Sequence, residues 1–130
     1  IPRGCDLWTY EVNMDMQILN DYSDVILQMI LEHPEADGVF AETDSLAMNC
    51  IQIYSGLGYR IPDDIKIITY GNLQFSFFSN PKLTLVQENT KEIARRAVGL
   101  MIHLIEGGKA APESCKEIIV PVSLNERKTT

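Results

Sequence analysis

Two polar clusters in this sequence carry side chains that could hydrogen bond to a small molecule. The first contains Thr43 and Asp44, which bring a hydroxyl and a carboxylate to the positions just after a short apolar run. The second contains Gly71 and Asn72, which directly follow a run of β-branched residues. Hydroxyl, carboxylate and amide groups bind polar ligands by donating or accepting hydrogen bonds. Together with Gln17, near the end of an alternating segment, these residues form the candidate ligand-binding set.

Asp44 also has a structural interpretation, which the sequence leaves open. An aspartate between a strand and a helix commonly caps the helix by accepting a hydrogen bond from its first backbone N–H groups. The segment Thr43-Asp44-Ser45 carries such a capping signal. Two roles therefore compete for Asp44, a helix cap and a ligand contact.

The sequence lacks the residue patterns of an enzyme or of a metal site. Its two histidines, His33 and His103, have no partner at the spacing of metal ligands. Its three cysteines, Cys5, Cys50 and Cys115, form no Cys-x-x-Cys pair, and three free thiols are typical of a reducing cytoplasm. Glycine-rich nucleotide-binding loops and the Gly-x-Ser-x-Gly motif of hydrolases are missing too. We therefore expect no catalytic residue, no metal and no cofactor.

The overall charge argues against direct binding of nucleic acid. The chain has 130 residues, of which 18 are acidic and 11 are basic, giving a net charge of −7. An acidic domain repels phosphate groups unless it has a basic patch, and the basic residues here are scattered. Apolar residues make up 45% of the chain, which is enough for a globular core. No apolar run is long enough to cross a membrane, so we expect no membrane contact.

The first third of the chain predicts a strand followed by a helix. Apolar and polar residues alternate over residues 7–18, which is typical of a strand with one buried face. Apolar residues then follow helical spacing over residues 22–30. Asn20 is the predicted N-cap of this helix, and Pro34 follows its end.

The rest of the chain alternates short apolar strands with amphipathic helices. The predicted strands cover residues 38–41, 65–70, 83–86 and 118–122, and the predicted helices cover residues 46–54 and 90–105. This order predicts a three-layer α/β/α fold with a mostly parallel sheet. In such sheets ligands bind beyond the carboxyl ends of the strands, which is where both polar clusters lie.

The helix predicted over residues 90–105 is apolar around most of its circumference. Ile93, Leu100 and Leu104 lie on one face, and Ile102 lies on the adjoining strip. A helix with this pattern is expected to be covered over more than half of its surface. Two partners could cover this helix: the sheet of the same chain or a second copy of the chain.

Two pairs of segments together resemble a known protein family. The first pair is ADGVFAETDSLA (36–47) and GYRIPDDIKIITY (58–70). The second pair is NPKLTLVQE (80–88) and VPVSLNERKTT (120–130). Their order and spacing are similar to the C-terminal portion of the LacI/GalR (lactose-repressor/galactose-repressor) family of transcription regulators.

The resemblance implies a periplasmic-binding-protein-like (type I) subdomain, one of two that hold a small-molecule effector, usually a sugar or sugar phosphate, between them. Family members act as homodimers in the cytoplasm and bind operator DNA through a helix-turn-helix domain, which is absent from residues 1–130. The helix over residues 90–105 corresponds to one that packs with the other subdomain. Because the chain begins at Ile1 rather than at a methionine, we expect a piece of a longer repressor. An exported sugar-binding protein of the same fold is the alternative.

The resemblance also assigns roles to the candidate residues. Thr43 stands where many members have an asparagine that contacts the ligand, and Asp44 matches the aspartate after it. Tyr70 matches the aromatic residue of a Gly-Tyr/Phe-Asp motif. Gly71 replaces the effector-contacting aspartate of that motif, so the carboxylate is missing here, and the amide of Asn72 is its expected substitute.

Overall fold

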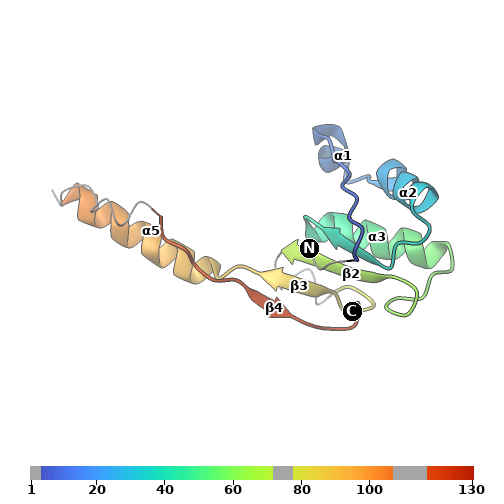
Figure 1. Cartoon of the computed structure of the whole chain (residues 1–130). Coiled ribbons are helices and arrows are strands. Elements are labelled where there is room, and N and C mark those ends of the chain that lie inside the picture. The colour runs from blue at the N-terminus through green and yellow to red at the C-terminus, as the bar shows by residue number, and fades with distance from the viewer. Residues whose placement is uncertain (1–3, 72–77, 107–116) are drawn as a thin grey trace.

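A four-stranded, mostly parallel sheet lies at the centre of the fold (Figure 1). The computed structural model describes residues 4–71, 78–106 and 117–130. In chain order, the elements are α1 (Met14–Leu19), α2 (Ser23–Glu32), β1 (Gly38–Ala41), α3 (Asp44–Gly56), β2 (Lys66–Gly71), β3 (Thr84–Gln87), α5 (Thr90–Ile105) and β4 (Ser123–Asn125). The strands lie in the order β1-β2-β3-β4; β1, β2 and β3 run parallel and β4 runs antiparallel to β3. The predicted α/β class and mostly parallel sheet are therefore confirmed.

The core lies between the sheet and the two helices α2 and α3. Helix α3 contacts β1 and β2, and α2 packs against α3 (Figure 1). Ile67 and Leu85 are fully buried on the strands, as are Ala47 on α3 and Ile26 on α2. The β-branched runs and the helical stripes of the sequence thus form one hydrophobic core. No helix in the described ranges is long and apolar enough to cross a membrane.

The prediction of a strand over residues 7–18 is wrong. Residues 14–19 form helix α1, and residues 7–13 belong to no strand. The side chain of Asn13 accepts a hydrogen bond of 2.9 Å from the backbone N of Met16, which starts the helix. An N-cap of this kind offers the backbone a local alternative to a strand, and it outweighs the two-residue alternation.

Asn20 ends helix α1 and does not start helix α2, so the N-cap prediction is also wrong. Its φ of 53° is left-handed, a conformation that asparagine tolerates at a helix C-terminus, and its backbone N donates to the carbonyl of Gln17. Helix α2 has Tyr22 at its N-cap position. The side chain of Asp21 accepts a 3.0 Å hydrogen bond from the backbone N of Ser23.

The last strand lies further along the chain than the sequence predicts. β4 begins at Ser123, which pairs with Gln87 of β3, and residues 118–122 form no strand. Pro121 lacks a backbone N–H and cannot donate to the ladder, and Ile119, two residues earlier, is exposed. The apolar run therefore does not coincide with the strand.

The end of the chain joins β2 to β3. The backbone carbonyl of Thr129 accepts a 2.8 Å hydrogen bond from the N of Ile67, and its hydroxyl donates to the carbonyl of Ile67 at 2.6 Å. The same hydroxyl accepts a 2.8 Å bond from the N of Thr84. Because Thr129 is fully buried, these contacts hold the amino-terminal ends of the two strands together.

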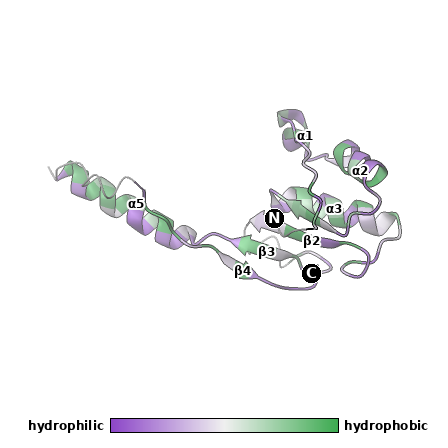
Figure 2. Ribbon diagram, in the orientation of Figure 1, coloured by the Kyte–Doolittle hydropathy of each residue, from purple (hydrophilic) through white to green (hydrophobic). Residues whose placement is uncertain are grey.

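Helix α5 leaves the sheet after β3 and projects away from it (Figure 1). Its predicted start is confirmed, because the side chain of Asn89 accepts a 3.1 Å hydrogen bond from the N of Glu92. None of its residues is buried, and Figure 2 shows apolar residues along its length. Leu100 and Leu104 are exposed, so the sheet of this chain does not cover the helix.

Candidate functional site

A polar hollow of about 330 Å³ lies at the carboxyl ends of the parallel strands. It is bounded by the ends of β2 and β3 and by the first residues of α3 and α5. Its described lining consists of Thr43, Asp44, Tyr70, Gly71, Gln87, Glu88 and Thr90. Three residues of the sequence-predicted set therefore share one hollow at the edge where parallel sheets bind ligands.

Thr43 caps helix α3 and leads into the hollow. Its hydroxyl oxygen accepts a hydrogen bond of 3.2 Å from the backbone N of Leu46. The cap is thus Thr43, and Asp44 is the first residue of the helix. The bound hydroxyl still has a proton to donate, so Thr43 can serve the helix and a ligand acceptor at once.

Thr69 fixes the strand end from which this capping segment starts. Its side chain is fully buried, and its hydroxyl donates a 3.0 Å hydrogen bond to the carbonyl of Ala41, the last residue of β1. This contact ties β1 to β2 at the edge of the hollow. Thr69 therefore positions the segment that carries Thr43.

Asp44 occupies space next to the backbone of Gly71. A β-carbon built on Gly71 would lie less than 3.0 Å from both carboxylate oxygens and from the Cγ atom of Asp44. Real β-carbons do not approach other atoms so closely, so residue 71 must lack a side chain while Asp44 keeps this position. A carboxylate, that of Asp44, therefore lies directly beside residue 71.

Two further side chains in the hollow are held by hydrogen bonds. The hydroxyl of Tyr70 donates to Oε1 of Glu88, and this bond to a carboxylate raises the pKa of the tyrosine. The amide nitrogen of Asn125 on β4 donates to Oε1 of Gln87 at 2.9 Å. Both acceptors are thereby oriented before a ligand arrives.

The remaining candidate residues have different outcomes. Asn72 lies outside the described residues. Gln17 is exposed on helix α1 and does not line the hollow, and the strand end that suggested it is absent. The same strand-end rule, applied to the segment 83–86, would have found Gln87 and Glu88, which follow it directly.

The side chains considered for catalysis or metal binding lie outside the hollow. Burial raises the pKa of the Cys50 thiol to about 12, so this core residue is not a nucleophile at neutral pH. His33 stacks on Trp8, and His103 is exposed on α5. Cys115 lies outside the described residues. Within the described ranges, no three histidine, cysteine or acidic side chains gather as metal ligands.

Comparison with known proteins identifies the family. Residues 5–130 match the periplasmic binding protein-like domain. The chain belongs to this family. Among its relatives, a ribose operon repressor of Halalkalibacterium halodurans is 29% identical over 92% of this chain. The HTH-type transcriptional repressor PurR of Pasteurella multocida is 32% identical over 68% of the chain. These repressors confirm the LacI/GalR resemblance of the binding-protein-like domain.

A solved structure places the binding-protein-like domain in the same fold. A LacI-family transcriptional regulator from Arthrobacter sp. FB24, in complex with lactose, has a TM-score of 0.73 and 27% identity over 82% of the chain. The chain spans 39% of that regulator, 35% of the ribose operon repressor and 28% of the repressor PurR. It therefore corresponds to about a third of such proteins.

Proposed function

We propose that this domain binds a small polar effector in the hollow at the carboxyl ends of β1, β2 and β3, and that the effector is a sugar. The observation that carries the proposal is the convergence there of a hydroxyl, two carboxylates and an amide, from Thr43, Asp44, Glu88 and Gln87. Sugar hydroxyls donate and accept hydrogen bonds, so such a set matches them well. The lactose complex of the Arthrobacter regulator supports this class of ligand.

The charge of the hollow favours an uncharged sugar over a sugar phosphate. Its described lining contains Asp44 and Glu88 and neither lysine nor arginine. Carboxylates accept hydrogen bonds from hydroxyl groups but repel a phosphate. Of the two effector classes suggested by the sequence, we therefore favour the neutral sugar.

The longer protein is proposed to be a homodimeric, cytoplasmic repressor and not an enzyme or an exported sugar-binding protein. Its relatives in the comparisons are named as transcriptional repressors. With its net charge of −7, the chain would contact operator DNA only through a separate domain. The first residue of α5, Thr90, lines the hollow, so effector contact there would change how α5 is held and thereby shift the repressor between two states.

Titration calorimetry with ribose, lactose, sucrose and ribose 5-phosphate tests the proposal. We expect at least one neutral sugar to bind more tightly than the phosphate. Thr43→Ala and Gln87→Ala should each lower the affinity for that sugar by about two- to tenfold, because each removes one neutral hydrogen bond of about 0.5–1.5 kcal/mol. Both residues are partly or fully exposed, so their loss should not unfold the domain.

Thr9→Ala is the matched control, since Thr9 is an exposed threonine that does not line the hollow. Its sugar affinity should equal that of the unmodified protein. Equal affinities for all three variants would remove the hollow as the sugar site. Preferential binding of ribose 5-phosphate would reject the charge argument.

A further inference from the structure

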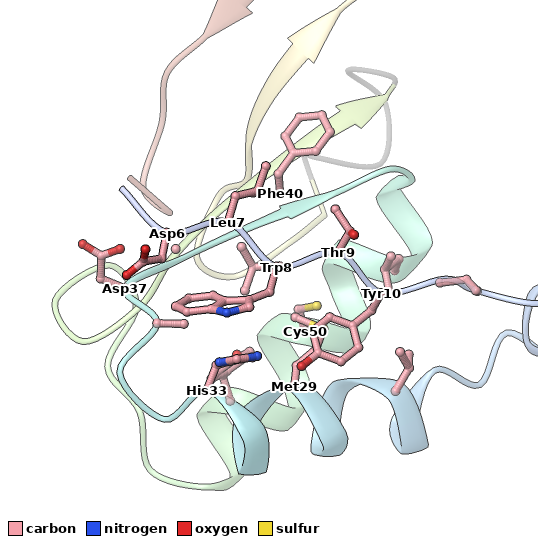
Figure 3. A pocket seen from close by; sticks show the side chains of 17 residues that line it. Asp6, Leu7, Trp8, Thr9, Tyr10, Met29, His33, Asp37, Phe40 and Cys50 are labelled. Atoms are coloured by element: carbon pink, nitrogen blue, oxygen red, sulfur yellow. The ribbon is translucent and has the colours of Figure 1, made fainter. Parts of the chain in front are cut away.

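A second cavity, of about 390 Å³, lies apart from the hollow and shares none of its lining residues (Figure 3). It is bounded by residues 6–12, helix α2, helix α3 and strand β1, and it is open to solvent on one side. The side chains from the helices and from β1 that face it are mostly apolar, among them Val25, Met29, Val39, Leu46 and Cys50. Its volume falls within the range of small-molecule sites in proteins.

One wall of this cavity is a fixed group of aromatic rings. The rings of Trp8 and His33 stack with centroids 3.9 Å apart and planes 20° from parallel. Tyr10 meets His33 edge-on at 6.3 Å, and its hydroxyl donates a 2.6 Å hydrogen bond to Glu32. The rings are therefore positioned without a ligand, and they offer flat apolar surface to one.

The charged side chains of the lining have one sign. Asp6 and Asp37 lie near each other at the end of the cavity beside Trp8 (Figure 3). Neither carboxylate makes an ion pair with another described residue, and the described lining contains neither lysine nor arginine. A cation placed at this end would meet two carboxylates and the π face of an indole.

We propose that this cavity is a second small-molecule site, which binds an organic amine composed of an apolar ring and a short ammonium-bearing chain. The ring would lie among the aliphatic side chains of α2, α3 and β1, and the ammonium group would lie at Asp6 and Asp37. An anionic or strongly hydrated ligand such as a free sugar does not match this lining. The site is thus chemically distinct from the effector hollow.

Trp8 makes the proposal directly measurable, because it is the single tryptophan of the chain and lines the cavity. The protein is titrated with phenethylamine, 2-phenylethanol and phenylacetate. These compounds share a phenyl ring and differ in the charge of their terminal group, which is positive, neutral and negative respectively. Phenethylamine should change the fluorescence of Trp8 saturably. 2-Phenylethanol should bind about five- to tenfold more weakly than phenethylamine, because it lacks the two exposed charge contacts with Asp6 and Asp37. Phenylacetate should bind more weakly still, because its carboxylate is repelled by both aspartates.

Paired variants test the role of the two carboxylates. In Asp6→Asn/Asp37→Asn, the affinity for phenethylamine should fall to that for 2-phenylethanol, while the alcohol binds as before. Asp63→Asn, which removes an exposed carboxylate outside the cavity, should change neither affinity. Thr43→Ala should also leave amine binding intact, which separates this site from the effector hollow.

Three results would overturn the proposal. Fluorescence that does not respond to any of the three compounds would show that residues 6–12 close over the cavity in solution. Phenylacetate binding at least as tightly as phenethylamine would reject the charge assignment. An unchanged preference for the amine in Asp6→Asn/Asp37→Asn would show that the two carboxylates do not hold its ammonium group.

Discussion

The side chain of Asp44 fills the space that a side chain at residue 71 would need. Both carboxylate oxygens of Asp44 would lie within 3.0 Å of a β-carbon on Gly71, and the Oδ1 atom is inaccessible to solvent. The position of the Asp44 side chain at the start of α3 therefore requires a glycine at residue 71, the end of β2. Gly71, which stands where the family motif has an aspartate, leaves the space that the carboxylate of Asp44 fills.

Gly71→Ala is expected to destabilise the domain because its methyl group would collide with Asp44. Overpacking of this kind costs about 1–3 kcal/mol. The cost should be much smaller in an Asp44→Ala background, where the collision partner is gone, so the two substitutions should be strongly coupled. Urea unfolding of the single and double variants measures this coupling. Equal costs of Gly71→Ala in both backgrounds would show that the two residues are independent.

Thr129→Val is expected to weaken the junction between β2 and β3. The valine keeps the shape of the side chain but leaves the N of Thr84 and the carbonyl of Ile67 without the hydroxyl that they share. Burying such groups without a partner costs about 1–3 kcal/mol each. Thr129→Ser keeps the hydroxyl and is the control, and it should retain most of the stability in thermal unfolding. A valine variant as stable as the serine variant would contradict this role.

The apolar surface of α5 predicts self-association of the isolated chain. Leu100, Met101 and Leu104 are exposed, and a stable monomer rarely shows so much apolar surface on one helix. Sedimentation velocity at tens of micromolar should therefore detect dimers or larger species. Leu100→Glu/Leu104→Glu should restore the monomer, whereas Lys91→Glu at an exposed position of the same helix should not. A monomeric unmodified chain would mean that α5 is covered in another way.

Asp64 is expected to stabilise the folded domain at neutral pH and to lose this contribution at acidic pH. The side-chain and backbone hydrogen bonds from Arg60 lower the pKa of Asp64 to about 2. A lowered pKa in the folded state stabilises the protein above the unfolded value of about 3.9, and this contribution disappears as pH falls to about 2. The difference in unfolding temperature between the unmodified chain and Asp64→Asn should therefore shrink over this window. An unchanged difference between pH 7 and pH 2 would contradict this role of Asp64.

Sequence patterns predict those features of the fold that are determined by residues close together in the chain, such as where a helix begins. The capping signal of the segment Thr43-Asp44-Ser45 marks the start of α3, although the cap is Thr43 and not Asp44, because the side chain needs only a backbone N–H three residues ahead. The sequence predicts Asn20 at the start of α2 and not at the end of α1, because asparagine suits both an N-cap and the left-handed residue after a helix. The position of β4 could not be predicted, since it depends on the register with β3, which is distant in sequence.

The candidate site was predictable to a similar extent. The strand-end rule brought Thr43, Asp44 and Gly71 to one hollow, since it needs only the order of strands and helices. It failed for Gln17 because the strand on which that residue was placed is a helix. The space between Asp44 and Gly71 depends on how α3 sits on the sheet, and sequence patterns carry no information on that distance.

The central claim is that the hollow at the strand ends binds a neutral sugar, and mapping of backbone amide shifts tests it most directly. The chain is titrated with ribose, lactose and sucrose, a method that detects weak binding as well as tight binding. We expect shifts at residues 43–46, 70–71 and 87–90, with no shifts at residues 36–40, which line the other cavity. Shifts confined to residues outside the hollow, or no shifts with any of the three sugars, would contradict it.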